Sequence, residues 1–227
     1  MKQNNILRIL VSLAAIVVPF VLLYKGIYGS LLFSFSVPLL WQVGIRGKTI
    51  STLGLQRKYL WRSVITGMIA GIVLALICGK LLQVLGMTGF VLTDSQKYLG
   101  FTLNKELSYR LLTGSDSLQG TLLYLLFSVF VIGLGEELFW RGLIQQKIAH
   151  WFPRHTAIWS TAVIFGLTHC YVFIILPLQQ GVITIAAVTV LGALWGYLFV
   201  RFNNIWGPAV CHGIIAFTIW KYYFFTQ

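Results

Sequence analysis

Acidic side chains are the scarcest feature of this sequence. Only five of its 227 residues are Asp or Glu, and all charged residues together make up 10%. Soluble domains average about 25% charged residues, so an ordinary soluble fold is excluded. Hydrophobic residues make up 58% and form long unbroken runs, whereas a transmembrane barrel would show short alternating segments. The sequence therefore predicts an all-α protein, a polytopic transmembrane helical bundle.

Cysteine is also rare, with three residues in the chain. Cys78, Cys170 and Cys211 each lie inside or beside an apolar run and form no CxxC pair. This pattern argues against a disulfide framework and against a zinc knuckle. We interpret all three as small buried hydrophobic residues, with a thiol nucleophile as the alternative for the two that neighbour histidines.

Positive charge is plentiful by comparison, because 17 Lys and Arg give a formal net charge of +12. In a soluble protein this balance would suggest a nucleic-acid partner. Here the basic residues gather at the ends of apolar runs, which indicates membrane orientation and contact with anionic lipids of the bilayer, and no nucleic-acid partner. Residues 46–62 hold five basic residues and no acid, so we expect this loop in the cytoplasm. The charge-balanced stretch 86–120 suits the outer face.

The apolar runs predict about seven membrane spans, within a range of six to eight. The predicted spans are residues 9–23, 28–43, 64–85, 118–150, 156–176, 182–200 and 205–224. A signal peptide is the alternative for the first span, but Lys25 and Tyr28 make a poor small-residue cleavage site, so we expect it to be retained. Residues 1–49 then form an N-terminal two-helix hairpin, and residues 50–227 form the core.

Two local patterns predict how these helices pack and where one of them begins. Gly67 and Gly71, at positions i and i+4 of the third span, predict close packing against a neighbouring helix. Ser117, or Asp116 before it, is suited to cap the fourth helix. At about 1.5 Å per residue that helix is longer than the hydrocarbon core, so its basic end should emerge in the cytoplasm.

Two of the five acids, Glu136 and Glu137, stand side by side within this apolar helix. A carboxylate at membrane depth is costly unless it is paired or hydrated, which favours a functional role over a charge cluster among the lipid headgroups. Glu137 and Arg141 are i, i+4 neighbours on one helix face, a spacing that suits an ion pair. Glu136 points about 100° away. The pattern therefore predicts a structural role for Glu137 and a chemical role for Glu136.

Two histidines lie in other predicted spans, His169 in the fifth and His212 in the seventh. A single histidine in a membrane helix is more often a packing residue that donates a hydrogen bond. Two histidines and an acid together favour catalysis, because a carboxylate and an imidazole can deprotonate water while a second imidazole donates to an oxyanion. Phe165, one turn before His169, is expected to pack against the imidazole.

Three motifs in this order resemble a known family. Residues 136–141 read EELFWR and match EExxxR, residues 165–169 read FGLTH and match FxxxH, and His212 lies where the motif HxxxN begins. Their order and spacing are similar to those of the CAAX-processing and bacteriocin-immunity family (CPBP, or Abi) of intramembrane glutamic proteases. Residues 52–57 also resemble the segment that leads into the core of that family, so the resemblance spans residues 50–220.

The resemblance implies a role for each matched residue. Glu136 would be the general base that activates water, assisted by His169, and His212 would help to form the oxyanion site. Three further residues would support the site by holding the first motif in place or by shaping the wall beside the histidine: Glu137, Arg141 and Phe165. The resemblance implies no metal and no cofactor.

One position departs from the family. The asparagine of HxxxN is replaced by Ala216, whose side chain cannot donate a hydrogen bond. Loss of one oxyanion donor lowers the rate by about 10²–10³-fold, so either another group (a main-chain amide, water or Thr218) substitutes or the enzyme is slow. A non-proteolytic bacteriocin-immunity or regulatory membrane protein is therefore the alternative function.

Two other chemistries fit parts of the pattern. Two histidines and an acid could supply three zinc ligands, although there is no HExxH motif. A proton-coupled transporter would also bury Glu and His, but it would show internal repeats, and none is evident. The expected function is an intramembrane endopeptidase that cleaves membrane-anchored protein or peptide substrates. The short chain with its basic N-terminus suits a bacterial inner membrane, with an active-site cavity that opens toward the cytoplasm.

Overall fold

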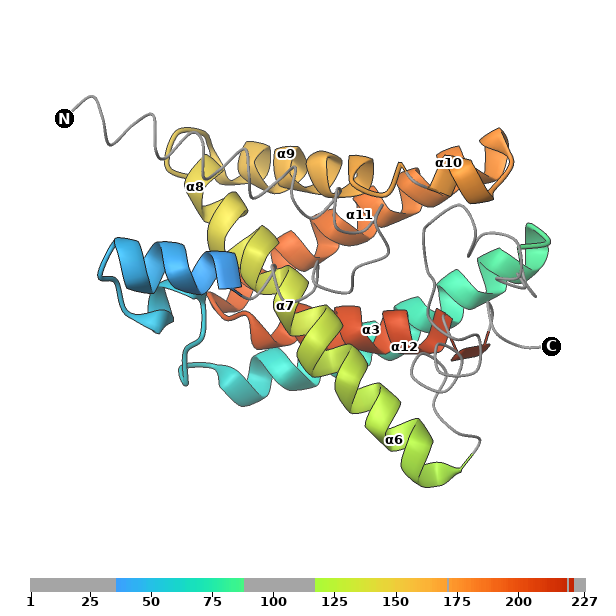
Figure 1. Ribbon diagram of the computed structural model, residues 1–227, viewed down its shortest axis with the longest axis horizontal. Helices are drawn as coiled ribbons and strands as arrows, with labels where there is room; N and C mark the ends of the chain where they lie inside the picture. Colours follow the sequence, from blue (N-terminus) through green and yellow to red (C-terminus); the bar gives the residue numbers. More distant parts are fainter. Residues whose placement is uncertain (1–35, 88–116, 171, 220, 223–227) are drawn as a thin grey trace.

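The computed structural model describes residues 36–87, 117–170, 172–219 and 221–222 (Figure 1). Every regular element in these ranges is a helix, which confirms the predicted all-α class. The predicted first span, residues 9–23, and the first part of the second span lie outside the described residues.

One long helix carries both glutamates and runs diagonally through the molecule, from α6 to α8 in Figure 1. It extends from Leu118 to Ile148, close to the predicted bounds. Its α and π segments alternate: α6 (Leu118–Phe127), η3 (Ser128–Gly133), α7 (Leu134–Glu137), η4 (Leu138–Gln145) and α8 (Gln146–Ile148). The predicted cap is present, because the Gly120 amide donates to the Ser117 hydroxyl over 3.1 Å.

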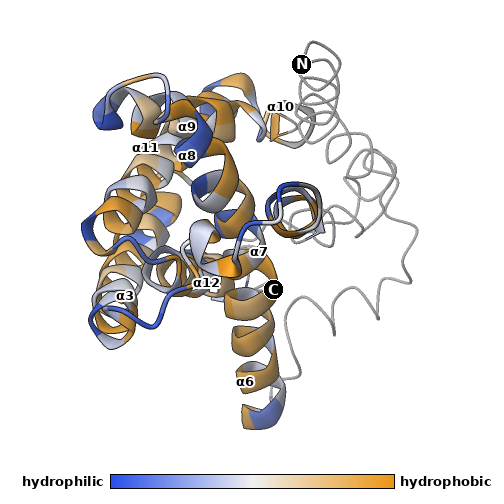
Figure 2. Cartoon of the chain, turned by 90° about the vertical axis from the view of Figure 1, so that its left-hand side faces the viewer, coloured by the Kyte–Doolittle hydropathy of each residue, from blue (hydrophilic) through white to orange (hydrophobic). Residues whose placement is uncertain are grey.

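Three of the described helices are long and apolar enough to cross a membrane. They are α3 (Leu60–Val84), the helix from Leu118 to Ile148, and α11 (Leu178–Phe202), while α12 (Trp206–Ile219) is apolar but shorter. In Figure 2, α6 is hydrophobic over most of its length, and hydrophilic residues gather in connections such as the one before α3. The protein is therefore an integral membrane protein. The predicted number of about seven spans is not confirmed by these three.

The prediction of one continuous span over residues 156–176 is wrong. The structure has α9 (Arg154–Leu167) and α10 (Val172–Ile175) instead, with His169 in the turn between them. The His169 amide donates to the Gly166 carbonyl, three residues back, over 3.0 Å, so the i, i+4 pattern of the α-helix has ended there. Hydropathy does not reveal this break, because apolar residues continue on both sides of it. Both helices contact α11, and α9 runs along it (Figure 1).

Helix α12 packs closely against both α3 and the long helix. A Cβ atom on Gly67 would collide with the main chain of Gly207, and Gly71 is similarly crowded by α12. The close packing predicted for these two glycines is therefore confirmed. On the long helix, Gly133 lies against the main chain of Ala209 in the same way. This second contact brings the two glutamates of α7 next to α12.

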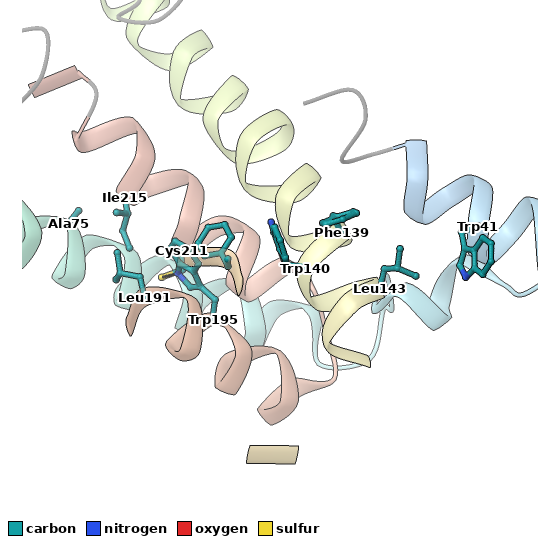
Figure 3. Packing of buried hydrophobic residues seen from close by; sticks show 10 residues of the cluster. Trp41, Ala75, Phe139, Trp140, Leu143, Leu191, Trp195, Cys211 and Ile215 are labelled. Carbon is teal, nitrogen blue, oxygen red and sulfur yellow. Dashed lines mark hydrogen bonds between the residues drawn. The ribbon is translucent and has the colours of Figure 1, made fainter. Parts of the chain in front are cut away.

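The first described segment packs onto the long helix. It contains η1 (Leu40–Ile45) and η2 (Ile50–Leu53). Trp41 of η1 belongs to the same core cluster as Phe139 and Leu143, and Figure 3 shows Trp41 and Leu143 at one end of this cluster.

The residues around η2 connect the long helix to the start of α12. Gln146 Nε2 donates to the Thr52 carbonyl over 2.9 Å. Asn204, whose side chain is fully buried, donates from Nδ2 to the carbonyls of Gln56 and Lys58 over 2.7 and 3.1 Å. The long helix and the turn that leads into α12 are thus bonded to one connecting segment.

Candidate active site

Glu136 and Glu137 occupy α7, a single α-helical turn between two π-helical segments. The side chain of Glu136 is 23% exposed, whereas that of Glu137 is fully buried. The two neighbours have different surroundings because they point about 100° apart on the helix. Glu136 is therefore the carboxylate that water or a substrate can reach.

The buried Glu137 forms the ion pair that its spacing predicted. Arg141 Nη1 donates to Glu137 Oε1 over 2.8 Å, and Arg141 Nη2 donates to the Gly192 carbonyl of α11 over 2.7 Å. The guanidinium carbon lies 5.2 and 5.4 Å from the ring centres of Phe165 and Trp195, within the range of cation–π attraction. The negative charge of Glu137 thus has a compensating positive charge that is itself bonded to a second helix.

His212 of α12 lies against both glutamates. Its Nδ1 is 2.9 Å from Glu137 Oε1, and its Nε2 is 3.9 Å from Glu136 Oε2. Because Glu137 Oε1 also accepts from Arg141 and so serves as an acceptor, Nδ1 is the donor in this bond. The indole of Trp195 stacks on the imidazole, with ring centres 4.0 Å apart and planes inclined by 13°. Neither the Glu137–His212 bond nor the role of Trp195 is predicted by the sequence, because these contacts join different helices and leave no spacing pattern in the chain.

His169 lies just beyond the end of α9. Its Nδ1 is 3.0 Å from the Phe165 carbonyl, which can only accept, so Nδ1 carries the proton. In the neutral ring Nε2 then bears the lone pair that can accept a proton. Glu136 and His212 are both close enough to interact electrostatically with the His169 imidazole.

Phe165 is the residue that both imidazoles share. Its ring centre lies 4.9 Å from that of His169 and 6.1 Å from that of His212, with edge-to-face geometry in both pairs. The structure therefore brings together all the residues that the motifs indicated, from the long helix, from the end of α9 and from α12. A partly exposed carboxylate and two imidazoles are groups that can act as general base, general acid and oxyanion donor in hydrolysis.

The position of the missing asparagine lies one turn after His212, on the same helix. Ala216 is partly buried there. The Thr218 hydroxyl donates to the Ile214 carbonyl of its own helix over 2.8 Å. Thr218 is thus bonded within α12, and the regular helix shows no distortion that would turn it toward the site.

The cysteines only partly match their predicted burial. Cys211 is buried and Cys78 is half-buried, but the prediction is wrong for Cys170, which is exposed. Cys170 lies in the turn that follows α9. Within the described residues, no group of three His, Cys, Asp or Glu side chains is arranged to hold a metal ion.

Comparison with known families agrees with the motifs. Residues 118–218 match the family model described as Type II CAAX prenyl endopeptidase Rce1-like, a range somewhat under half the length of the chain. The matched range contains every residue that the motifs assigned to the site. The predicted resemblance to the CAAX-processing family is therefore confirmed. No curated protein and no solved structure shows a significant match to the chain.

Proposed function

We propose that this chain is an intramembrane endopeptidase that hydrolyses peptide bonds of membrane-associated protein or peptide substrates, because residues 118–218 match the family model described as Type II CAAX prenyl endopeptidase Rce1-like. The observation that carries the proposal is the meeting of Glu136, His169 and His212 at one place. These residues are separated widely in the sequence, and the first of them is the exposed member of a carboxylate pair.

In the proposed mechanism, a water molecule held by Glu136 and His169 is the nucleophile. Glu136 takes one proton from the water, the water oxygen bonds to the scissile carbonyl carbon, and the carbonyl oxygen becomes an oxyanion. When the C–N bond breaks, the proton held by Glu136 passes to the leaving nitrogen. His169 assists through Nε2, the nitrogen that its bond to the Phe165 carbonyl leaves basic.

His212 supplies the oxyanion donor in this proposal. Nε2 must carry a proton to donate, and Nδ1 already donates to Glu137. The working form in this proposal is therefore the imidazolium, whose positive charge lies between the carboxylates of Glu137 and Glu136. The pairing of Glu137 with His212 gives the second glutamate a function beyond its bond to Arg141.

The mechanism is tested with Glu136→Gln and His169→Ala. Each is expected to lower kcat by at least about 10²-fold, because each removes a group that moves a proton in the transition state. His155→Ala is the matched control, since His155 is exposed and bonded to the Tyr197 hydroxyl over 3.0 Å, outside the site. The measurement is cleavage of membrane-anchored reporter peptides in proteoliposomes, with prenylated and unprenylated C-termini as separate arms. Wild-type rates in both site variants would contradict the mechanism.

The catalysis is proposed to need no metal. The same proteoliposomes are expected to keep their activity after treatment with a zinc chelator. Loss of activity that added Zn²⁺ restores would instead support the zinc alternative.

The site is proposed to open toward the cytoplasm of a bacterial cell. The support is the basic character of the connections at one end of the bundle, where Arg57, Lys58 and Arg62 are exposed. Labelling of Lys58→Cys, in a chain whose Cys78, Cys170 and Cys211 are replaced by alanine, from one side of sealed vesicles of known orientation tests this topology.

The alternative is a non-proteolytic membrane protein with the same fold. Ala216 favours it, because the described residues place no side-chain donor at the position of the missing asparagine. A biological phenotype that survives Glu136→Gln would support this alternative over the endopeptidase.

A further inference from the structure

The indole of Trp195 covers one face of the His212 imidazole. The ring centres are 4.0 Å apart and the planes differ by 13°. The second aromatic contact of this imidazole, with Phe165, is edge-to-face at 6.1 Å and 79°. A parallel stack fixes the plane of the imidazole, while the edge contact limits its position within that plane.

Trp195 is itself held firmly. It is 3% exposed, and its Nε1 donates to Cys211 Sγ over 3.3 Å. The Arg141 guanidinium lies 5.4 Å from the ring centre. Because Cys211 directly precedes His212, one side chain of α11 contacts two successive residues of α12. Figure 3 shows the indole of Trp195 next to Cys211.

We propose that Trp195 is a positioning residue for His212, which keeps the imidazole in the plane where Nδ1 reaches Glu137 and Nε2 faces Glu136. This inference rests on the proposed endopeptidase function. Without the indole, the bond to Glu137 still holds one edge of the ring, but the ring can tilt about that bond. A displacement of about 1 Å in a catalytic group lowers a rate by about 10²-fold.

The first test compares three variants for cleavage in proteoliposomes. Trp195→Leu is expected to lower kcat by about 10–10²-fold while KM stays within about threefold. Trp195→Phe is expected to keep most of kcat, because a phenyl ring can still stack on the imidazole. The matched control is Trp159→Leu, at a half-exposed tryptophan of α9, and it should leave both constants unchanged.

The second test detects the stack directly by NMR. The chain has four histidines, so a sample with ¹³C-labelled histidine rings gives a simple spectrum, and His212→Ala assigns the His212 signals. The indole should shift the His212 ring protons upfield. Trp195→Leu should remove this shift without moving the other histidine signals. If Trp195→Leu does not fold, Trp195→Met, whose unbranched side chain is more adaptable and has no aromatic plane, replaces it in both tests.

The outcomes separate the positioning role from the proposed function. An unchanged kcat in Trp195→Leu, an equal loss in Trp195→Phe, or His212 signals that do not move would each overturn the role of Trp195. Unchanged cleavage in Glu136→Gln would instead overturn the endopeptidase mechanism, and the ring-current shift would still be present.

Discussion

At the scale of single residues, Glu137 is bonded to two other side chains of the site. Its Oε1 atom accepts from Arg141 at 2.8 Å and from His212 at 2.9 Å, while its Oε2 atom has no hydrogen-bond partner among the described residues. Removal of one member of a buried ion pair costs about 3–5 kcal/mol, because the remaining charge is uncompensated. The i, i+4 spacing predicted the bond to Arg141. The bond to His212 could not be predicted from the sequence, because the two residues are 75 positions apart.

Ala216 occupies the position of the family's asparagine, an oxyanion donor. Ala216→Asn is expected to raise kcat by about 10–10²-fold, because it restores a side-chain donor one turn after His212. The measurement is kcat for a cleaved reporter peptide in proteoliposomes.

The control for this substitution is Ala216→Leu, which adds a side chain of similar size that cannot donate. It should not raise kcat. Equal effects of the two variants would show that added bulk, and not a donor, changes the rate.

At the scale of elements, the π-helical segments affect the direction in which the side chains of the glutamate motif point. η3 and η4 flank the single α-helical turn that carries both glutamates. A π turn holds more residues than an α turn, so it rotates the side chains that follow it, and such segments are frequent at functional sites. The apolar runs predicted the long helix and its end points. They could not predict the π segments or the break at His169, because both depend on hydrogen bonding rather than on hydropathy.

The element-scale prediction concerns the contact of α3 with α12. Gly67→Ala is expected to lower the free energy of unfolding by about 1–3 kcal/mol, because the new Cβ atom meets the main chain of Gly207, which cannot move aside. Thermal unfolding in detergent measures the effect. Gly44→Ala is the control, since a Cβ atom there meets no atom within 4 Å. Equal melting temperatures for the two variants would contradict the packing account.

At the scale of the whole molecule, one connecting segment is bonded both to the long helix and to the turn before α12. Gln146 and Asn204 both donate to main-chain carbonyls between residues 52 and 58. The sequence predicted this region from its resemblance to a family segment, but not the bonds. Every residue has a main-chain carbonyl, so the sequence does not indicate which carbonyl accepts a given hydrogen bond.

Asn204→Ala is expected to lower the free energy of unfolding by about 1–3 kcal/mol, because it removes a buried amide that donates to the carbonyls of Gln56 and Lys58. It also removes the acceptor of the Trp206 amide at the start of α12. The melting temperature in detergent should fall, and kcat should fall with it because α12 carries His212.

The control for Asn204 is the residue before it. Asn203 is exposed and has a φ of +47°, so Asn203→Gly relieves a left-handed conformation and should leave stability unchanged or raise it. A larger fall in melting temperature in Asn203→Gly than in Asn204→Ala would contradict this account.

The pairing of Glu137 with Arg141 also bears on how the protein enters the bilayer during synthesis. An unpaired arginine near the centre of a helix opposes insertion by about 2.5–3.5 kcal/mol. The partner carboxylate is one turn away on the same helix, so the pair can form before α11 and α12 have been made. The nascent helix can therefore leave the translocon with these two charges already neutralised, and it need not wait for its later neighbours.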